Sequence, residues 1–248
     1  MTESNKIKPI EREIEKRVLV LDGATGTMIQ RLELNEADFR GERFRDHPST
    51  LKGNNDILCL TRPDAVASIH RLYLEAGADL ISTNSFNANA ISQQDYGTSH
   101  LVYEINKTAA QIAKGEAAAA AVAGRPRFVC GSIGPTGKTA SIPVNAADPA
   151  ERSVTFDELA NAYREQVRGL VEGGADVLLV ETVFDSLNAK AAIYAISLEF
   201  DARGDYVPVM LSASVSGAGA RLLTGQTAED FISAVSHAPH LLTIGLNC

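Results

Sequence analysis

The sequence has no tryptophan, and its 248 residues include only three cysteines, Cys59, Cys130 and Cys248. An odd and small number of cysteines does not suit the disulfide framework that stabilises small secreted domains. The cysteine content therefore indicates a reducing compartment, and we expect the protein to be cytoplasmic.

Long apolar runs are also missing. No stretch reaches the roughly 18 residues that a membrane-spanning helix needs, and the charged N-terminus, MTESNKIKPIEREIEKR, lacks the apolar centre of a signal peptide. Basic residues number 23 against 31 acidic ones, for a net charge of -8, and they cluster no further than in pairs. We therefore expect no nucleic-acid partner and no membrane partner.

Six short apolar runs are present, and their continuous apolar character is typical of strands buried on both faces of a parallel sheet. They cover residues 18–22, 79–84, 128–132, 176–181, 207–212 and 242–248. Helical stretches lie between them, at residues 63–76, 101–123, 155–172, 186–200 and 227–237. Three of these begin with a hydroxyl residue followed three positions later by an acid, namely Thr61 with Asp64, Thr155 with Glu158 and Thr227 with Asp230. The alternation predicts right-handed βαβ units.

Loop lengths point to one functional face. The helix-to-strand turns are tight, and two of them repeat a similar pattern, EAGAD at 75–79 and EGGAD at 172–176. The strand-to-helix loops are long, at 23–60, 85–99, 133–154 and 213–226. This distribution predicts an α/β fold of the (β/α)8 TIM type. Since such a barrel needs about eight strands, we expect one incomplete barrel domain over residues 1–248 with about six βα units, C-terminally truncated; a doubly wound open sheet is the alternative.

Polar residues end the predicted strands and are expected to meet at the barrel mouth: Asp22, Asn84, Ser132, Glu181, Ser212 and Cys248. After the first strand, the glycines of the segment DGATGT at 22–27 allow close backbone approach, so that successive N–H groups can hold a carboxylate or phosphate. Asp22 suits an ammonium group, although a tight turn capped by Asp22 explains the segment equally well. Glu181 follows four apolar residues, where an acid is costly unless it has a partner.

The segment SIGPTGKT at 132–139 is close to a phosphate-binding P-loop. It lacks the first glycine, Pro135 removes one N–H group, and Pro143 follows too soon for the helix that the motif requires. Cys248 is placed to bind a metal or attack a substrate, but no nearby cysteine or histidine completes a zinc set. Cys59 and Cys130 are expected to be buried thiols.

Eight stretches resemble the homocysteine-binding module of cobalamin-dependent methionine synthases, within the homocysteine S-methyltransferase family. In order along the chain they are LDGATGTMIQ, LNEADFRGERF, LKGNNDIL, GADLISTNSF, GSIGPTGKTAS, GGADVLLVETVFDSLNAKAA, TGQTAEDF and GLNC. LNEADFRGERF and ETVFDSLNAKAA are specific to this enzyme, whereas the wider family shares mainly the D-G, E-T and N-C elements.

The resemblance implies transfer of a methyl group from methylcobalamin to the thiolate of zinc-bound homocysteine, which forms methionine. It implies that backbone N–H groups bind the substrate carboxylate and that two acids bind its ammonium group. The substrate-binding residues are then Asp22, Gly23, Ala24, Thr25, Gly26, Thr27, Glu181, Asn247 and the strand-end residue Asn84. Cys248 is implied as the catalytic residue and as the first of three cysteine zinc ligands. Bound zinc would lower the pKa of the substrate thiol.

The sequence also departs from the family pattern. The other two zinc ligands belong to a G-G-C-C-G segment that does not occur here, and the folate and cobalamin modules are absent. Thr25 stands where the family usually has methionine, and Ser82 where glutamate is common. We therefore expect the methylcobalamin and folate modules of a parent protein as partners, and an isolated chain that is inactive and poorly stable because an open sheet exposes apolar edges. The alternatives are a zinc-dependent homocysteine methyltransferase with another methyl donor, and a noncatalytic barrel or P-loop-like phosphate binder.

Overall fold

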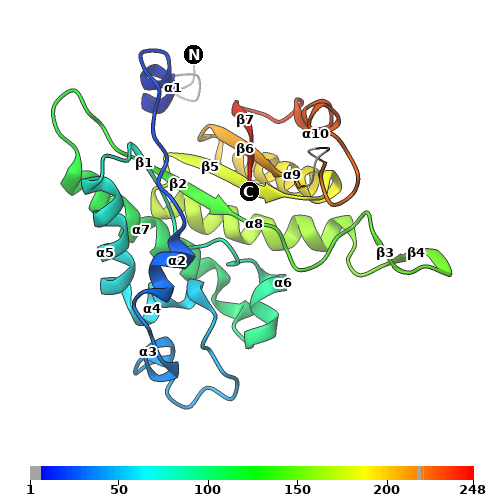
Figure 1. The fold of residues 1–248 in the computed structure, drawn as a ribbon, viewed down its shortest axis with the longest axis horizontal. Coiled ribbons are helices and arrows are strands. Elements are labelled where there is room, and N and C mark those ends of the chain that lie inside the picture. Colours follow the sequence, from blue (N-terminus) through cyan, green and yellow to red (C-terminus); the bar gives the residue numbers. More distant parts are fainter. Residues whose placement is uncertain (1–6, 217–218, 220) are drawn as a thin grey trace.

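The computed structural model describes residues 7–216, 219 and 221–248, so parts of the N-terminal stretch and of the predicted loop 213–226 lie outside the described residues. One sheet of five parallel strands forms the centre of the fold (Figure 1). Its strands, in spatial order, are β1 (Leu80–Ser82), β2 (Phe128–Ile133), β5 (Val177–Val183), β6 (Val209–Ser214) and β7 (Leu241–Asn247).

The strand order distinguishes the two folds that the sequence left open. In a doubly wound sheet the order of the strands reverses at a switch point. Here each strand of the sheet pairs in parallel with the sheet strand that precedes it in the chain, without reversal. The prediction of an incomplete TIM-type barrel is therefore confirmed.

The segment predicted as the first strand, residues 18–22, forms a single parallel bridge from Leu21 to Leu80. Val18 is 85% exposed and Val20 is 55% exposed, so the expectation of burial on both faces was wrong for this segment. The physical reason is its position at an open edge of the sheet, where no further strand of the described residues covers it.

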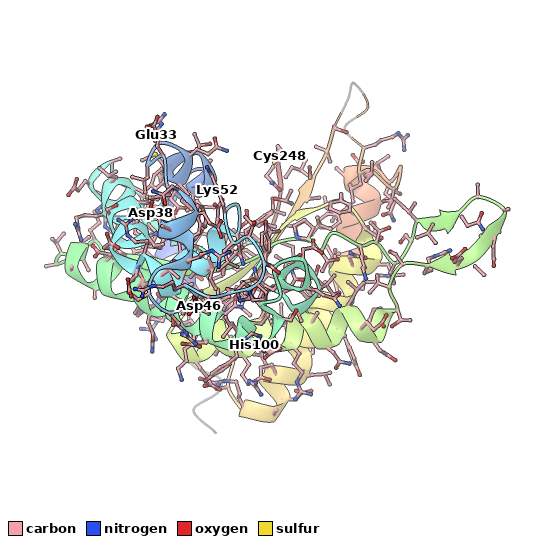
Figure 2. The ribbon with its side chains drawn as sticks, turned by 90° about the horizontal axis from the view of Figure 1, so that it is seen from below. Glu33, Asp38, Asp46, Lys52, His100 and Cys248 are labelled. Atoms are coloured by element: carbon pink, nitrogen blue, oxygen red, sulfur yellow. The ribbon has the colours of Figure 1, made fainter. Side chains whose placement is uncertain are left out.

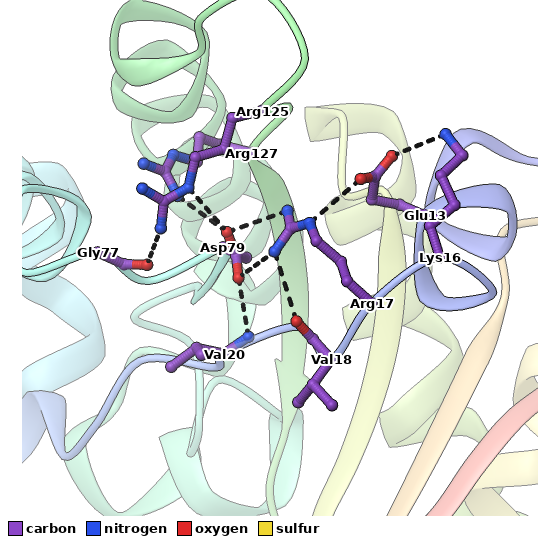
Figure 3. Close-up of polar contacts among 9 residues, drawn as sticks. All are labelled: Glu13, Lys16, Arg17, Val18, Val20, Gly77, Asp79, Arg125 and Arg127. Atoms are coloured by element: carbon purple, nitrogen blue, oxygen red, sulfur yellow. Dashed lines mark hydrogen bonds and ion pairs between the residues drawn. The ribbon is translucent and has the colours of Figure 1, made fainter.

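Side-chain hydrogen bonds add to the few backbone hydrogen bonds that join this edge segment to the sheet (Figure 3). The Asp79 carboxylate accepts the Val20 N–H over 3.1 Å and is also bound by Arg17. Asp176 repeats the arrangement further along the sheet, where it accepts the Val129 N–H over 2.9 Å. The recurring tight turn of the sequence thus ends in an aspartate that binds a backbone N–H of the neighbouring strand.

Five main helices alternate with the sheet strands, and their bounds agree with the predicted stretches within a few residues (Figure 1). They are α5 (Pro63–Glu75), α7 (Val102–Ala120), α8 (Phe156–Gly173), α9 (Ser186–Arg203) and α10 (Ala228–Val235). Thr155 and Thr227 form the predicted capping boxes. The prediction for Thr61 was wrong: this residue ends the short helix α4 (Leu58–Thr61), and Arg62 takes the N-cap position of α5.

The inner face of the sheet is the face that would line the inside of a closed barrel. It is covered less completely than the face that packs against the main helices. Helix α1 (Pro9–Ile14) buries Ile10 against the apolar residues near the amino ends of the strands. On β6, Met210 and Ser212 of the inner face are only half-buried, whereas the residues that alternate with them are buried. The expectation that every strand is buried on both faces therefore fails for β6, because this part of the inner face lacks a covering layer, and for the edge strand β7, which has no buried residue.

The long strand-to-helix loops carry short elements of their own. Residues 23–60 contain α2 (Thr25–Gln30), α3 (Glu36–Arg40), η2 (Asn55–Ile57) and part of α4, and residues 85–101 contain α6 (Ala90–Gln93), η3 (Gln94–Tyr96) and η4 (Ser99–Leu101). The exposed hairpin of β3 (Pro143–Asn145) and β4 (Asp148–Arg152) projects from the body of the molecule (Figure 1). Across the described ranges, no helix is both long enough and apolar enough to span a bilayer.

Candidate substrate-binding site

A cavity of about 420 Å³ lies where the carboxyl ends of the strands meet the loop elements. Most of the predicted substrate-binding residues line it, namely Asp22, Gly23, Ala24, Thr25, Gly26, Asn84, Glu181 and Asn247. Thr27 and Cys248 are outside the cavity lining, each one residue beyond a lining residue. The fold thus brings together side chains from positions far apart in the sequence.

Two serines on neighbouring strands bind the two predicted acids. Ser82 donates to Asp22 twice, from its N–H over 2.8 Å and from Oγ over 2.9 Å. Ser132 Oγ donates to Glu181 Oε1 over 2.5 Å. Each carboxylate is therefore held by the end of an adjacent strand. The serine that replaces the family's common glutamate at position 82 has a definite partner, which the sequence did not reveal.

Burial governs the charge of this pair. It raises the pKa of Asp22 to about 7, against the effect of the Ser82 hydrogen bonds, and the nearby Glu181 charge raises that pKa further. Burial also raises the pKa of Glu181, which Ser132 partly offsets. Among the described residues, no lysine, arginine or histidine lines the cavity. The site therefore combines three acids, Asp22, Glu181 and Asp56, with no cationic side chain, which suits a positively charged ligand group.

The segment predicted as a backbone cradle forms the first turn of α2. Ala24 is the N-cap and Thr25 begins the helix, so N–H groups of this turn have no partner within the helix and form the positive end of its dipole. Gly23 packs against Tyr73 of α5, and a Cβ at this position would lie 3.1 Å from Tyr73 Oη. Tyr73 Oη also donates to the Ala24 carbonyl oxygen over 3.3 Å. A side chain at position 23 would therefore require the Tyr73 ring to shift by a few tenths of an ångström.

One wall of the cavity consists of residues that were not predicted from the sequence. Asp56 accepts the Asn87 N–H over 3.0 Å, and Asn84 Nδ2 donates to the Asn55 carbonyl oxygen over 2.7 Å. Burial raises the pKa of Asp56 to about 7. The only signal was the polar run NND directly before the apolar run ILCL, which indicates polar groups entering a core.

Cys248 lies at the end of β7, at the open edge between the α2 region and α10 (Figures 1 and 2). Its sulfur is exposed, whereas Cys59 and Cys130 are buried and unbridged as predicted. Asn247 Nδ2 donates to Cys248 Sγ over 3.1 Å. Within the described ranges, no group of three histidine, cysteine or acidic residues is placed to hold a metal. These residues alone therefore do not make a zinc site, and Cys248 is a single candidate ligand.

The P-loop-like segment forms no phosphate-binding loop. No helix begins at Lys138 or Thr139. Two N–H groups of the following residues are already bound: Ala140 N donates to Asn188 Oδ1 and Ser141 N donates to Asp185 Oδ2, each over 3.0 Å. The loop is thus anchored to the start of α9.

The model of the Homocysteine S-methyltransferase family matches residues 19–248. The chain belongs to this family. Homocysteine S-methyltransferases transfer a methyl group to homocysteine, so the chain is a methyltransferase or part of one. The D-G and E-T elements contribute Asp22, Gly23 and Glu181 to the cavity lining, in agreement with this assignment.

Solved structures support the fold of this homocysteine S-methyltransferase. The oxidized form of the homocysteine methyltransferase MmuM from Escherichia coli superposes with a TM-score of 0.74 at 20% identity, over 98% of this chain and 77% of that chain. Its metallated form gives a TM-score of 0.73 at 20% identity, over 97% of this chain and 78% of that chain. At this level of identity, the likeness establishes the common barrel architecture alone.

Proposed function

We propose that the chain is the homocysteine-binding part of a cobalamin-dependent methionine synthase. The enzyme-specific stretches support this choice within the family. LNEADFRGERF forms α3 and the turns beside it, and ETVFDSLNAKAA runs from Glu181 on β5 into α9. Both stretches therefore belong to the loop face that carries the cavity.

One observation carries the substrate proposal: Asp22 and Glu181 line the cavity beside the first turn of α2. The two acids suit the ammonium group of an amino acid, and the N–H groups of the helix start suit its carboxylate. An α-amino acid with a free thiol has both of these groups, and we propose that its sulfur lies toward Cys248, which follows the lining residue Asn247.

The reaction joins the homocysteine sulfur to a methyl carbon while the bond from that carbon to the donor breaks and its electron pair stays with the donor. Zinc would supply a lowered thiol pKa, which favours the nucleophilic thiolate at neutral pH. We propose Cys248 as one of its ligands, with methylcobalamin as the donor and the cobalamin and folate modules as partners. The free thiols of Cys59 and Cys130 fit a cytoplasmic location.

Calorimetric titration of the protein with homocysteine at pH 8 tests the substrate assignment. We expect Glu181→Gln to weaken binding by at least about tenfold, because a charge-assisted contact is lost. Glu104→Gln is the control, since Glu104 forms an exposed ion pair with Arg43 on the protein surface. Equal affinities of the Glu181 variant and the unmodified protein would contradict the proposal.

The donor is tested separately, by supplying the zinc-loaded parent protein, of which we propose this chain to be a part, with methylcobalamin or with a methyl sulfonium compound and measuring methionine. Methionine from methylcobalamin supports the proposal, and methionine from the sulfonium compound alone makes the chain a homocysteine methyltransferase of another kind. The 248-residue chain by itself is expected to be inactive, and methionine formation by it would overturn that expectation.

A further inference from the structure

Strand β5 contains a bulge directly beside the proposed ammonium site. Val180 pairs with Leu211 and Val183 pairs with Ala213, so Glu181 and Thr182 together face one residue of β6. Thr182 has φ +58°. A β-branched residue rarely adopts this left-handed conformation, because its side chain crowds the backbone. Such a bulge re-aims side chains and is frequent next to active sites.

The strained residue contacts the side chain of Asn247. Thr182 N–H donates to Asn247 Oδ1 over 3.2 Å, and Asn247 Nδ2 donates to Thr182 Oγ1 over 2.9 Å. Ser212 Oγ also donates to Oδ1, over 2.8 Å, and Nδ2 makes its second bond to Cys248 Sγ over 3.1 Å. The amide of Asn247 thus uses two acceptor and two donor positions, which is its full capacity.

The backbone of Thr182 determines which way this amide points. An N–H group can only donate, so the amide oxygen must face Thr182 N and the amide nitrogen must face away from it. The nitrogen then reaches the Thr182 hydroxyl and the Cys248 sulfur. In the opposite orientation the amide nitrogen of Asn247 would face the N–H of Thr182, so that two donors would meet. The amide oxygen would then face the Cys248 sulfur.

We propose that Thr182 is a positioning residue that acts through Asn247 on the sulfur of Cys248. The bulge turns the N–H and the hydroxyl of Thr182 toward the side-chain amide of Asn247, and this amide donates a hydrogen bond to the Cys248 sulfur. The same bulge presents Glu181 to the cavity, so one backbone irregularity places both the ammonium-binding acid and the group that holds the cysteine. The catalytic role of this arrangement rests on the proposed function, whereas the hydrogen bonds between Thr182, Asn247 and Cys248 do not depend on it.

Nuclear magnetic resonance of the full chain tests the contact without any assay of methyl transfer. The side-chain N–H resonances of Asn247 are compared in the unmodified protein and in Thr182→Val, which removes the hydroxyl and keeps the shape. We expect hydrogen exchange of this amide to become about tenfold faster in Thr182→Val, in line with the loss of one hydrogen bond. Thr182→Ser keeps the hydroxyl and is expected to restore slow exchange.

A second substitution and a sulfur control complete the test. Thr182→Ala removes the hydroxyl without a β-branched side chain, and it replaces Thr182→Val if that variant does not fold. Cys248→Ala is expected to shift the same Asn247 resonances, because it removes the sulfur acceptor. Unchanged Asn247 exchange in both hydroxyl-free variants, or equal effects of the serine and valine variants, would overturn the proposal.

The transfer assay separates this proposal from the proposed function. In an active, zinc-loaded protein, Thr182→Val is expected to lower kcat about tenfold and to leave KM for homocysteine within about threefold, because the amino-acid contacts are intact. Faster Asn247 exchange in a protein that transfers no methyl group would reject the proposed function and keep the positioning role. An unchanged kcat of Thr182→Val would show that the positioning of Asn247 by Thr182 does not affect catalysis.

Discussion

Arg17 and Asp79 form a two-point ion pair in which Arg17 Nη1 donates to Oδ2 over 2.8 Å and Nη2 donates to Oδ1 over 3.2 Å (Figure 3). Arg127 adds a bond of 3.0 Å to the same carboxylate, which is almost fully buried. Because Asp79 also accepts the Val20 N–H, this pair fixes the segment that leads to Asp22. A contact at the amino ends of the strands thereby supports a site at their carboxyl ends.

Asp79→Asn is expected to lower the free energy of unfolding by about 2–3 kcal/mol at pH 7. Burial raises the pKa of Asp79, but the bonds from Arg17 and Val20 outweigh it and set the value at about 2. Since the folded pKa lies below the ordinary value, the contribution is present above about pH 4 and lost as the pH falls toward 2. Urea unfolding at pH 7 measures the change. As a control, Glu104→Gln breaks an exposed ion pair and should lower the free energy of unfolding by less than about 1 kcal/mol. An equal decrease for both variants would contradict the special role of Asp79.

Gly173→Ala is expected to destabilise the protein by about 2 kcal/mol or more, although alanine is the better helix former. A Cβ at Gly173 on α8 would collide with the Lys107 carbonyl oxygen of α7, and Gly169, one turn earlier, would meet Tyr103 in the same way. Gly115 of α7 has open space around it, so Gly115→Ala should stabilise by roughly 0.5–1 kcal/mol. Thermal unfolding of the two variants should therefore shift in opposite directions, and a shared direction would contradict the packing argument.

Asp22→Asn is expected to stabilise the ligand-free protein at pH 8 by about 2–4 kcal/mol while it weakens homocysteine binding. Burial raises the folded pKa of Asp22 to about 7. The folded state therefore holds an extra proton between about pH 4 and 7, and stability falls as the pH rises through this window. Unfolding curves at pH 5 and pH 8 should show the gain mainly at pH 8. A gain of the same size at both values would mean that ionisation of Asp22 is not its cause.

His70→Leu should increase stability, most of all in acid. Both ring nitrogens of this histidine are buried and have no hydrogen-bond partner among the described residues, and burial lowers its pKa to about 4. The unfolded chain takes up the proton near pH 6.5, so the stability of the unmodified protein falls between about pH 6.5 and 4. Relative to the unmodified protein, the free energy of unfolding of His70→Leu should increase by about 2 kcal/mol more at pH 5 than at pH 7.5. His237→Gln changes an exposed residue and should leave both values unchanged.

The sequence was sufficient for the order of the main elements. Continuous apolar runs predicted β1, β2, β5, β6 and β7, because strands inside a parallel sheet must be apolar along their length. Caps at Thr155 and Thr227 predicted helix starts, since a cap is formed by residues close in sequence. Four of the six polar residues predicted at strand ends, Asp22, Asn84, Ser132 and Glu181, line the cavity, because parallel strands bring their carboxyl ends to one face.

Tertiary structure alone decided how these residues meet. The bulge at Thr182, the orientation of Asn247 and the pairing of Ser82 with Asp22 depend on the register between strands that lie far apart in the chain. The exposure of Val18 depends on which strands are beside it. Local sequence determines which residues can form a strand or a cap, whereas hydrogen bonds between distant segments depend on their final relative placement, and only the packed sheet sets that placement.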